Sequence, residues 1–317
     1  MIPLFYISIF ILSSLILAKA GSLAVANLIM IAEYLNWKKF VVGSLIMGLL
    51  SSMPELFVGL SSALSQRPTL AFGNIIGANI ILLTLVSSTA VLLGGTITLK
   101  SRSIQRSLMF SGFYALLPLL LLVDGYFSRG DGIILLIALG FYLREFFIHQ
   151  KKFSKVFVQK KATKNYKLFF KYFTRFLIGF LFLIFSAQGM VFSASRLALT
   201  LDLPLVFVGA VAVALGTSLP ELSFGLRSVI MKQKQMFLGT LFGSIALNSS
   251  LILGLTCLIA PFRVYNIGLF VSGFIFTGLA VLLFLIFFKT GDKITKREAK
   301  VLLFVYILFF IIQVLIK

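Results

Sequence analysis

The sequence predicts an all-α integral membrane protein with about ten transmembrane helices in two inverted-topology repeats of five helices. Three observations predict this fold: the hydrophobic composition, the placement of lysine and arginine, and an internal repeat. The chain has 317 residues, of which 60% are hydrophobic and only 12% are charged, and its mean hydropathy is +1.08. A soluble domain would be about half apolar and about a quarter charged. We therefore expect the chain to fold in a lipid bilayer.

Long apolar runs divide the chain into its expected helices. A run of about 20 apolar residues is long enough to cross the hydrocarbon core of a membrane as a helix. The expected spans are 3–34, 41–65, 70–93, 106–123, 132–148, 169–199, 204–230, 236–260, 266–288 and 299–316.

Lysine and arginine gather in every second connection between these spans. The rich connections contain residues 38–39, 100–106, 151–175, 232–234 and 289–300, whereas the others carry only Arg67, Arg129, Arg263 and Lys317. Cytoplasmic loops are the ones enriched in lysine and arginine. We therefore expect a multi-pass protein of the cell membrane with both termini extracellular and the loop 151–168 cytoplasmic. The net charge of +20 then forms a cytoplasmic face that attracts anionic lipid headgroups, not a surface for nucleic acid.

An internal repeat relates the two halves of the chain, residues 1–150 and 169–317. A shift of 166 residues aligns them without gaps from residue 42 to residue 77, and the expected repeat units are about 41–94 and 207–260. Five spans precede the second unit, so the two units cross the membrane in opposite directions. Such inverted repeats are typical of transporters, whose binding sites lie near the midplane where the repeats meet. The shift superposes identical residues at Val42 and Val208, Gly43 and Gly209, Ser52 and Ser218, Pro54 and Pro220, Glu55 and Glu221, Gly59 and Gly225, Gly73 and Gly239, and Gly77 and Gly243.

Two of the nine acidic residues lie deep inside apolar spans. These are Glu55 and Glu221, which the repeat makes equivalent. An ionised acid at the centre of a membrane helix costs roughly 2.5–3.5 kcal/mol. Two equivalent acids at this depth indicate a functional site more than a pair of protonated carboxyl groups satisfied by neighbouring helices.

Oxygen-bearing groups surround both acids. Pro54 and Pro220 directly precede them, and each proline lacks the N–H that would bond to the carbonyl one turn earlier. Calcium takes about six to eight oxygen ligands in flexible geometry and favours carboxylates. We therefore expect a site for calcium, or for another divalent cation, that also contains hydroxyls one turn before each acid. The expected metal ligands are Glu55, Glu221, Ser51 and Thr217, and the neighbouring hydroxyls are Ser52 and Ser218.

The next helix of each repeat carries glycines at helical spacing, which let membrane helices approach closely. Polar residues on these helices add oxygens to the site or hydrogen-bond neighbouring helices. They are Asn74, Asn79, Ser244 and Asn248.

Three segments resemble a known family. Residues 48–55 (Gly-Leu-Leu-Ser-Ser-Met-Pro-Glu) and 214–221 (Ala-Leu-Gly-Thr-Ser-Leu-Pro-Glu) resemble the alpha repeats of the cation/calcium antiporter superfamily. Residues 73–79 (Gly-Asn-Ile-Ile-Gly-Ala-Asn) are similar to its Gly-Asn-x-x-Gly-Ser-Asn signature. The resemblance is closest to microbial sodium/calcium exchangers, and it extends over the chain in span number, inverted halves and central basic loop.

This resemblance implies a secondary active antiporter, not an enzyme, that exchanges Ca²⁺ for Na⁺ by alternating access and exports calcium. It implies no cofactor, inorganic cations as partners, and an ion path lined by the second, third, seventh and eighth helices. Glu55 and Glu221 correspond to the family's acidic calcium ligands. Its sodium-binding hydroxyls and carbonyls correspond to Gly48, Ser51, Ser52, Ala214, Thr217 and Ser218, and its polar residues on the eighth helix to Ser244 and Asn248.

The third helix departs from the family pattern. Ala78 replaces a serine and Leu82 replaces an asparagine, while Thr240 stands where the first repeat has Asn74. Ala78 and Leu82 each remove an oxygen ligand from one half of the site. Proton/calcium exchange is therefore the alternative, because burial can keep a glutamate protonated.

Lys19 lies in the middle of the first span and has two interpretations. Its ammonium group either snorkels to the membrane surface, or it stands as a fixed positive charge beside the part of the site that Ala78 and Leu82 leave without oxygens.

Two further functions compete with antiport. A membrane phosphatase acting on lipid pyrophosphates would need arginines for phosphate near the acids, and Arg227 lies more than one turn beyond Glu221. A passive cation channel would need a continuous pore. Pumping driven by ATP is not expected, because the sequence contains no phosphate-binding Gly-x-x-x-x-Gly-Lys-Ser/Thr loop.

Overall fold

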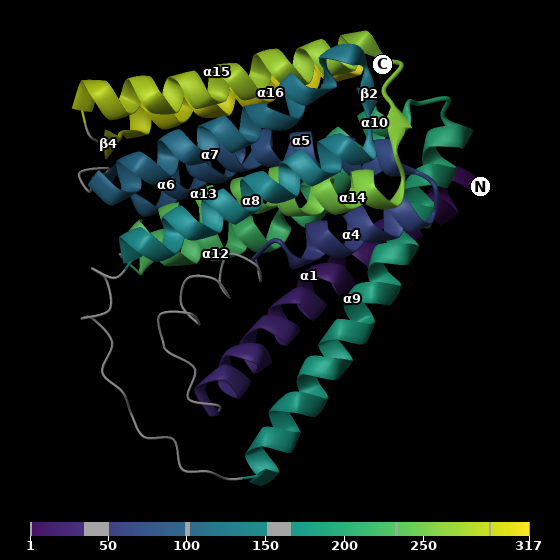
Figure 1. Ribbon diagram of the computed structural model, residues 1–317, viewed down its shortest axis with the longest axis horizontal. Coiled ribbons are helices and arrows are strands. Elements are labelled where there is room, and N and C mark those ends of the chain that lie inside the picture. The colour runs from purple at the N-terminus through teal and green to yellow at the C-terminus, as the bar shows by residue number, and fades with distance from the viewer. Residues whose placement is uncertain are drawn as a thin grey trace.

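The computed structural model describes residues 2–34, 51–98, 102–150, 166–231, 234–291 and 293–316, and these residues form a helical bundle with two very short sheets (Figure 1). The predicted all-α fold is confirmed. The helices of the first half are α1 (Ile2–Tyr34), α4 (Met53–Leu64), α5 (Pro68–Ile81), α6 (Ser87–Gly94), α7 (Arg102–Leu121) and α8 (Arg129–Gln150). Those of the second half are α9 (Tyr166–Thr200), α10 (Leu205–Val208), α11 (Ala214–Thr217), α12 (Leu219–Ile230), α13 (Lys234–Leu247), α14 (Leu253–Ile259), α15 (Ile267–Gly291) and α16 (Lys296–Ile316).

Short π-helical segments continue three of these helices. They are η2 (Leu82–Val86) between α5 and α6, η4 (Gly209–Val213) between α10 and α11, and η5 (Asn248–Ile252) between α13 and α14. A single 3₁₀ turn, η3 (Leu122–Asp124), follows α7.

Each predicted span coincides with helix wherever the chain is described. Within the described residues, six helical stretches are long and apolar enough to cross a membrane, and a seventh is formed if the pair Leu205–Thr217 and Leu219–Ile230, bent by 43°, counts as one span. The three other predicted spans correspond to α4, α7 and α8. Residues 35–50, which precede α4, lie outside the described residues, and the part of α7 searched for spans, Met109–Asp124, is shorter than a full span.

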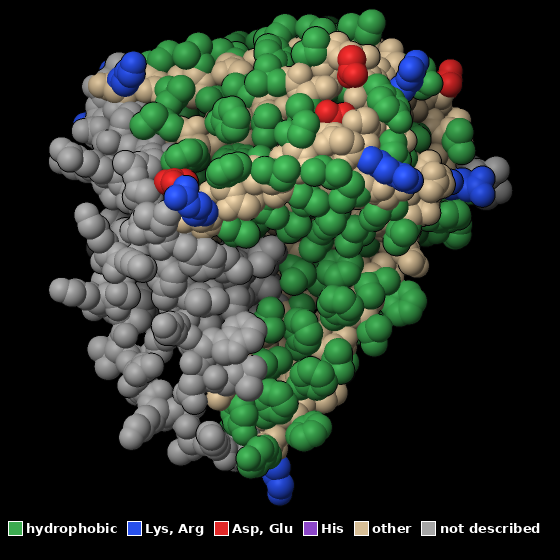
Figure 2. All heavy atoms as spheres, viewed as in Figure 1, with side chains coloured by type: hydrophobic (Ala, Val, Ile, Leu, Met, Phe, Trp, Pro, Cys, Tyr) green, Lys and Arg blue, Asp and Glu red, His purple; other side chains and the backbone are tan. Residues whose placement is uncertain are grey.

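The outer surface is mostly apolar, as lipid contact requires. Figure 2 shows hydrophobic side chains over most of the described part of the visible face, with only a few lysine, arginine and acidic side chains among them. Phe185 on α9 and Phe304 on α16, for example, are 67% and 63% exposed. A soluble monomer rarely exposes an apolar surface of this extent.

The secondary structure repeats with the offset found in the sequence. Adding 166 to the bounds of α4, α5 and η2 gives the bounds of α12, α13 and η5. Even the π-helical segments are equivalent, so the gap-free register extends beyond residue 77 to residue 86.

Two antiparallel strand pairs join the halves at opposite ends of the bundle. Strand β1 (Ile97–Thr98) pairs with β4 (Lys293–Ile294), and β2 (Tyr126–Phe127) pairs with β3 (Phe262–Arg263). Figure 1 shows β4 at one end and β2 at the other, with both chain termini near the end that carries β2. Termini at one end are what an even number of spans produces.

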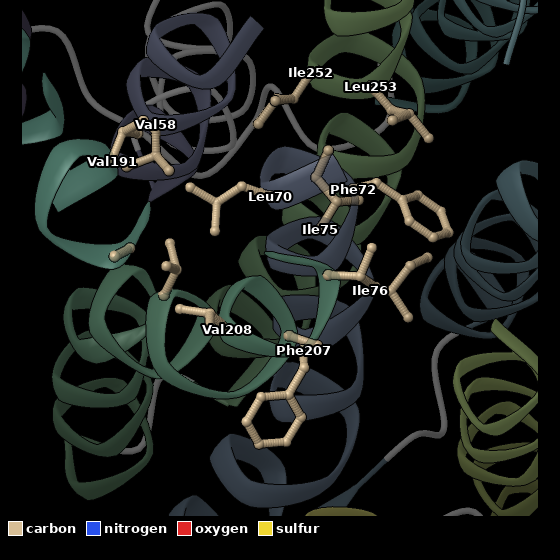
Figure 3. Packing of buried hydrophobic residues seen from close by; sticks show 14 of the residues in the cluster. Val58, Leu70, Phe72, Ile75, Ile76, Val191, Phe207, Val208, Ile252 and Leu253 are labelled. Carbon is tan, nitrogen blue, oxygen red and sulfur yellow. The ribbon is translucent and has the colours of Figure 1, made fainter. Parts of the chain in front are cut away.

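The core lies where the two halves meet. Figure 3 shows Val58 of α4, Leu70 and Ile75 of α5, Val191 of α9 and Ile252 of η5 converging in one apolar cluster. All five side chains are at most 1% exposed. This cluster contains residues of both halves, so the two repeats are packed into one body.

Glycines bring α5 against α10 and η4, backbone to backbone. A Cβ atom added to Gly73 would lie 2.2 Å from the carbonyl oxygen of Val206, and one added to Gly77 would lie 2.1 Å from that of Ala210. From the other side, a Cβ on Gly209 would lie 2.4 Å from the carbonyl oxygen of Leu70. No larger residue fits this crossing without separating the helices, so the close approach predicted for Gly73 and Gly77 is confirmed.

Candidate cation-binding site

Glu55 and Glu221 occupy the first turns of α4 and α12. Each helix restarts at a proline in its first turn, and the residue before the restart, Ser52 or Ser218, has non-helical dihedral angles (φ −88°, ψ 10° and φ −83°, ψ 0°). The helix dipole favours negative charge at such an N-terminus. The local sequence therefore places both carboxylates at breaks in their spans.

The two carboxyl groups lie deep in the protein and close to each other. Glu55 is 1% exposed and Glu221 5% exposed. Their charges interact electrostatically across the boundary between the two halves. Side chains 166 residues apart in sequence thus form a single acidic centre.

Hydroxyl and amide groups from four spans form hydrogen bonds between the two halves. Ser51 and Ser244 share a hydrogen bond of 2.7 Å between their hydroxyl oxygens, and Thr217 donates to Asn74 Oδ1 at 3.1 Å. The first bond connects the approach to α4 with α13, and the second connects α11 with α5. The second, third, seventh and eighth spans therefore all contribute polar groups.

Several buried polar atoms of this centre have no hydrogen-bond partner among the described residues. Because buried polar groups are nearly always paired in native proteins, such a cluster indicates that a ligand completes it. A cation would pair with the oxygens. The atoms are one Oε2 each of Glu55 and Glu221, the Oγ atoms of Ser52 and Ser218, Oδ1 and Nδ2 of Asn248, Oδ1 of Asn79 and Nδ2 of Asn74.

The donor set suits a hard cation more than a transition metal. Within the described ranges, no group of three or more histidine, cysteine or acidic side chains is placed to hold a metal ion. Two carboxylates would supply the charge for one calcium ion, and neutral oxygens would complete its coordination.

Two pairs of predicted site residues hydrogen-bond each other, Ser51 with Ser244 and Thr217 with Asn74. The carbonyl of Ala214 accepts from the backbone N–H of Ser218 at 3.0 Å and from the Thr217 hydroxyl at 3.4 Å, so this oxygen already has partners. Gly48 lies outside the described residues.

Lys19 is not part of the cluster. Its side chain is exposed on α1, whereas the buried face of that helix includes Leu17, Ala20 and Ala24. This exposure favours the snorkelling interpretation of Lys19 over a fixed charge beside the site.

Ser249 hydrogen-bonds a predicted site residue, although the sequence did not single it out. Its hydroxyl accepts a hydrogen bond of 2.8 Å from Asn79 Nδ2, and both residues are fully buried. The run Asn248-Ser249-Ser250 inside an apolar span was the available signal. An α-helical projection could not show which of its hydroxyls faces Asn79, because η5 is π-helical.

Known proteins resemble this chain over most of its length. Residues 5–147 and 171–315 match the model of the family described as sodium/calcium exchanger protein. The sodium/calcium exchanger MaX1 of Methanosarcina acetivorans is 26% identical over 345 aligned positions, which cover 96% of this chain and 97% of MaX1. The inner membrane protein YrbG of Escherichia coli K12 is 27% identical over 239 positions, or 70% of each chain.

The fold also matches a solved exchanger structure. The sodium-calcium exchanger NCX_Mj, soaked with sodium and without calcium, superposes with a TM-score of 0.62 at 25% identity, covering 96% of this chain and 98% of that chain. The family match, the fold and the paired acidic repeats agree with one another. The chain belongs to the sodium/calcium exchanger family.

Proposed function

We propose that this protein is a secondary active antiporter that moves calcium out of the cell in exchange for sodium, at the site between Glu55 and Glu221. The observation that carries the proposal is the pair of buried, mutually repelling glutamates. The Oε2 atom of each has no hydrogen-bond partner among the described residues. A cation bound between them would relieve this repulsion. The family assignment supports exchange of calcium for another cation, and it argues against the phosphatase alternative.

The site's charge supports obligatory exchange. Two ionised carboxylates at membrane depth are costly without a counter-ion. The protein would therefore rearrange between its inward-open and outward-open forms only with cations bound. The breaks before α4 and α12 place each glutamate at a helix terminus, where small changes in helix direction alter its access to one side.

Proton/calcium exchange is the second candidate. Ala78 and Leu82 are 0% and 2% exposed and add no oxygen to the first repeat, which favours a driving ion that needs fewer ligands than sodium. A proton bound to either glutamate would require no further oxygen ligand.

Uptake of radiolabelled calcium into proteoliposomes tests both sodium/calcium exchange and proton/calcium exchange. We expect calcium to accumulate when an outward sodium gradient is imposed, and the accumulation to disappear when a sodium ionophore dissipates the gradient. Accumulation driven only by a proton gradient would select the second candidate. Failure of both gradients to move calcium would contradict the proposal.

We propose that both termini are extracellular and that the loop 151–168 is cytoplasmic, because the lysine-rich connections then share the cytoplasmic side. In a variant whose only native thiol is removed by Cys257→Ala, Lys155→Cys should resist an impermeant thiol reagent on intact cells. Tyr265→Cys is the matched control. It lies in the connection between β3 and α15, where Tyr265 is 85% exposed, and it should react. The opposite labelling pattern would reverse the topology.

A further inference from the structure

The two repeats differ at positions whose side chains hydrogen-bond between the halves. Ser51 and Ser244 share a hydrogen bond of 2.7 Å, and the residues equivalent to them under the offset of 166 are Thr217 and Ala78. Ala78 has no hydroxyl, and Thr217 bonds to Asn74 instead. One of two symmetry-related hydroxyl pairs is therefore missing.

A second polar pair also lacks a polar equivalent in the other repeat. Asn79 donates to Ser249, whereas the residues equivalent to this pair are Ile245 and Leu83, both 1% exposed. A buried polar pair between the halves thus corresponds to two buried apolar residues at the symmetry-related positions.

Asn248 repeats the pattern a third time. Both polar atoms of its side chain are buried without a partner among the described residues. Its equivalent is Leu82, which is 2% exposed and packs in an apolar cluster with Ala78 and Phe237. Three polar positions of the eighth span, Ser244, Asn248 and Ser249, therefore correspond to three apolar positions of the third.

These differences limit how many cations the site can hold. Every cation in a buried site needs oxygens that replace its hydration shell, and the apolar side of the third span offers none at these three positions. Glu55 and Glu221 carry two negative charges, which one divalent or two monovalent cations neutralise.

We infer that this site binds either one divalent cation or two monovalent cations, so that each exchange cycle moves no net charge, an inference that rests on the proposed function. The conclusion applies whether the monovalent cation is sodium or a proton. It follows from the loss of oxygens at Ala78, Leu82 and Leu83 and from the presence of only two carboxylates.

The test is the calcium gradient that wild-type proteoliposomes reach at equilibrium, with the membrane potential set by potassium and valinomycin. For a two-for-one exchange, a tenfold gradient of the driving cation should support about a 100-fold calcium gradient, and the potential should not change it. A cycle that moves one net charge would instead change the calcium gradient about 50-fold for each 100 mV imposed.

The outcomes separate this inference from the proposed function. Calcium accumulation that responds to the potential would overturn electroneutral exchange and leave calcium antiport intact. Absence of calcium movement under sodium and proton gradients alike would overturn the proposed function and this inference with it.

A pair of variants tests the cause. In Ala78→Ser/Leu82→Asn the third span regains a hydroxyl and a carboxamide, and we expect the Hill coefficient for the driving cation to rise and a response to potential to emerge. Leu93→Asn is the control, because it adds the same amide at a position that is 67% exposed, and it should behave as wild type. A double variant that transports calcium with wild-type coupling would show that the missing oxygens do not set the stoichiometry.

Discussion

Replacing Glu55 or Glu221 with glutamine is expected to abolish calcium transport while the protein still folds. Glutamine keeps the size of the side chain and one oxygen but removes one of the two negative charges. Removing one partner of a buried charge pair costs about 3–5 kcal/mol, which corresponds to a loss of at least about 100-fold in calcium affinity. The amide should be tolerated in the fold, because a neutral group is easier to bury than a carboxylate.

The measurement is calcium uptake by each variant in proteoliposomes, with its elution profile in gel filtration as the check on folding. Asp124→Asn is the matched control. Asp124 is exposed, and its side chain accepts from the Tyr126 N–H at 3.0 Å, which asparagine can also do. Wild-type uptake by both glutamine variants would show that cations bind elsewhere.

Gly77→Ala should destabilise the protein and reduce transport together. The added methyl group would lie 2.1 Å from the carbonyl oxygen of Ala210, so α5 and η4 must move apart. Overpacking of this kind costs about 1–3 kcal/mol even where side chains can adjust, and here the obstacle is backbone. The shift would also separate Asn74 on α5 from Thr217 on α11, whose 3.1 Å hydrogen bond crosses the site.

Thermal unfolding in detergent and calcium uptake, both compared with Gly278→Ala, measure this effect. Gly278 lies within α15, and no atom comes within 4 Å of a Cβ built on it, so its substitution should change neither property. Equal stability and uptake for the two variants would mean that the close crossing of α5 and η4 is not needed.

Much of the architecture could be predicted from the sequence, because a bilayer imposes simple rules. Apolar length predicts the spans, and lysine and arginine predict their direction. The fixed offset of 166 residues identified Glu55 and Glu221 as equivalent, and the structure then brings them together. Each of these signals is local or repeats at a constant spacing, so no knowledge of packing is needed.

Other features depend on contacts that no local pattern encodes. The π-helical segments insert an extra residue into a turn without a compositional mark, so the direction of Ser249 could not be read from helical spacing. The strand pairs β1–β4 and β2–β3 are two residues long and join the two halves. The sequence shows that Lys19 lies in the middle of a span. It does not show which face of α1 carries the side chain.

The departures at Ala78 and Leu82 were visible in the sequence, but their consequence depends on structure. Only the hydrogen bonds show that Ser51 pairs with Ser244 across the site and that the equivalent pair is incomplete. The third span therefore offers fewer side-chain oxygens to the site than the eighth span does.

We propose that calcium and the driving cation share one site between Glu55 and Glu221. Equilibrium binding of radiolabelled calcium to the purified protein in detergent, measured as sodium concentration and acidity are raised separately, tests it most directly. We expect one calcium ion per chain, displaced progressively by sodium or by protons. Bound calcium that stays at one ion per chain at saturating sodium and at low pH would contradict a shared site.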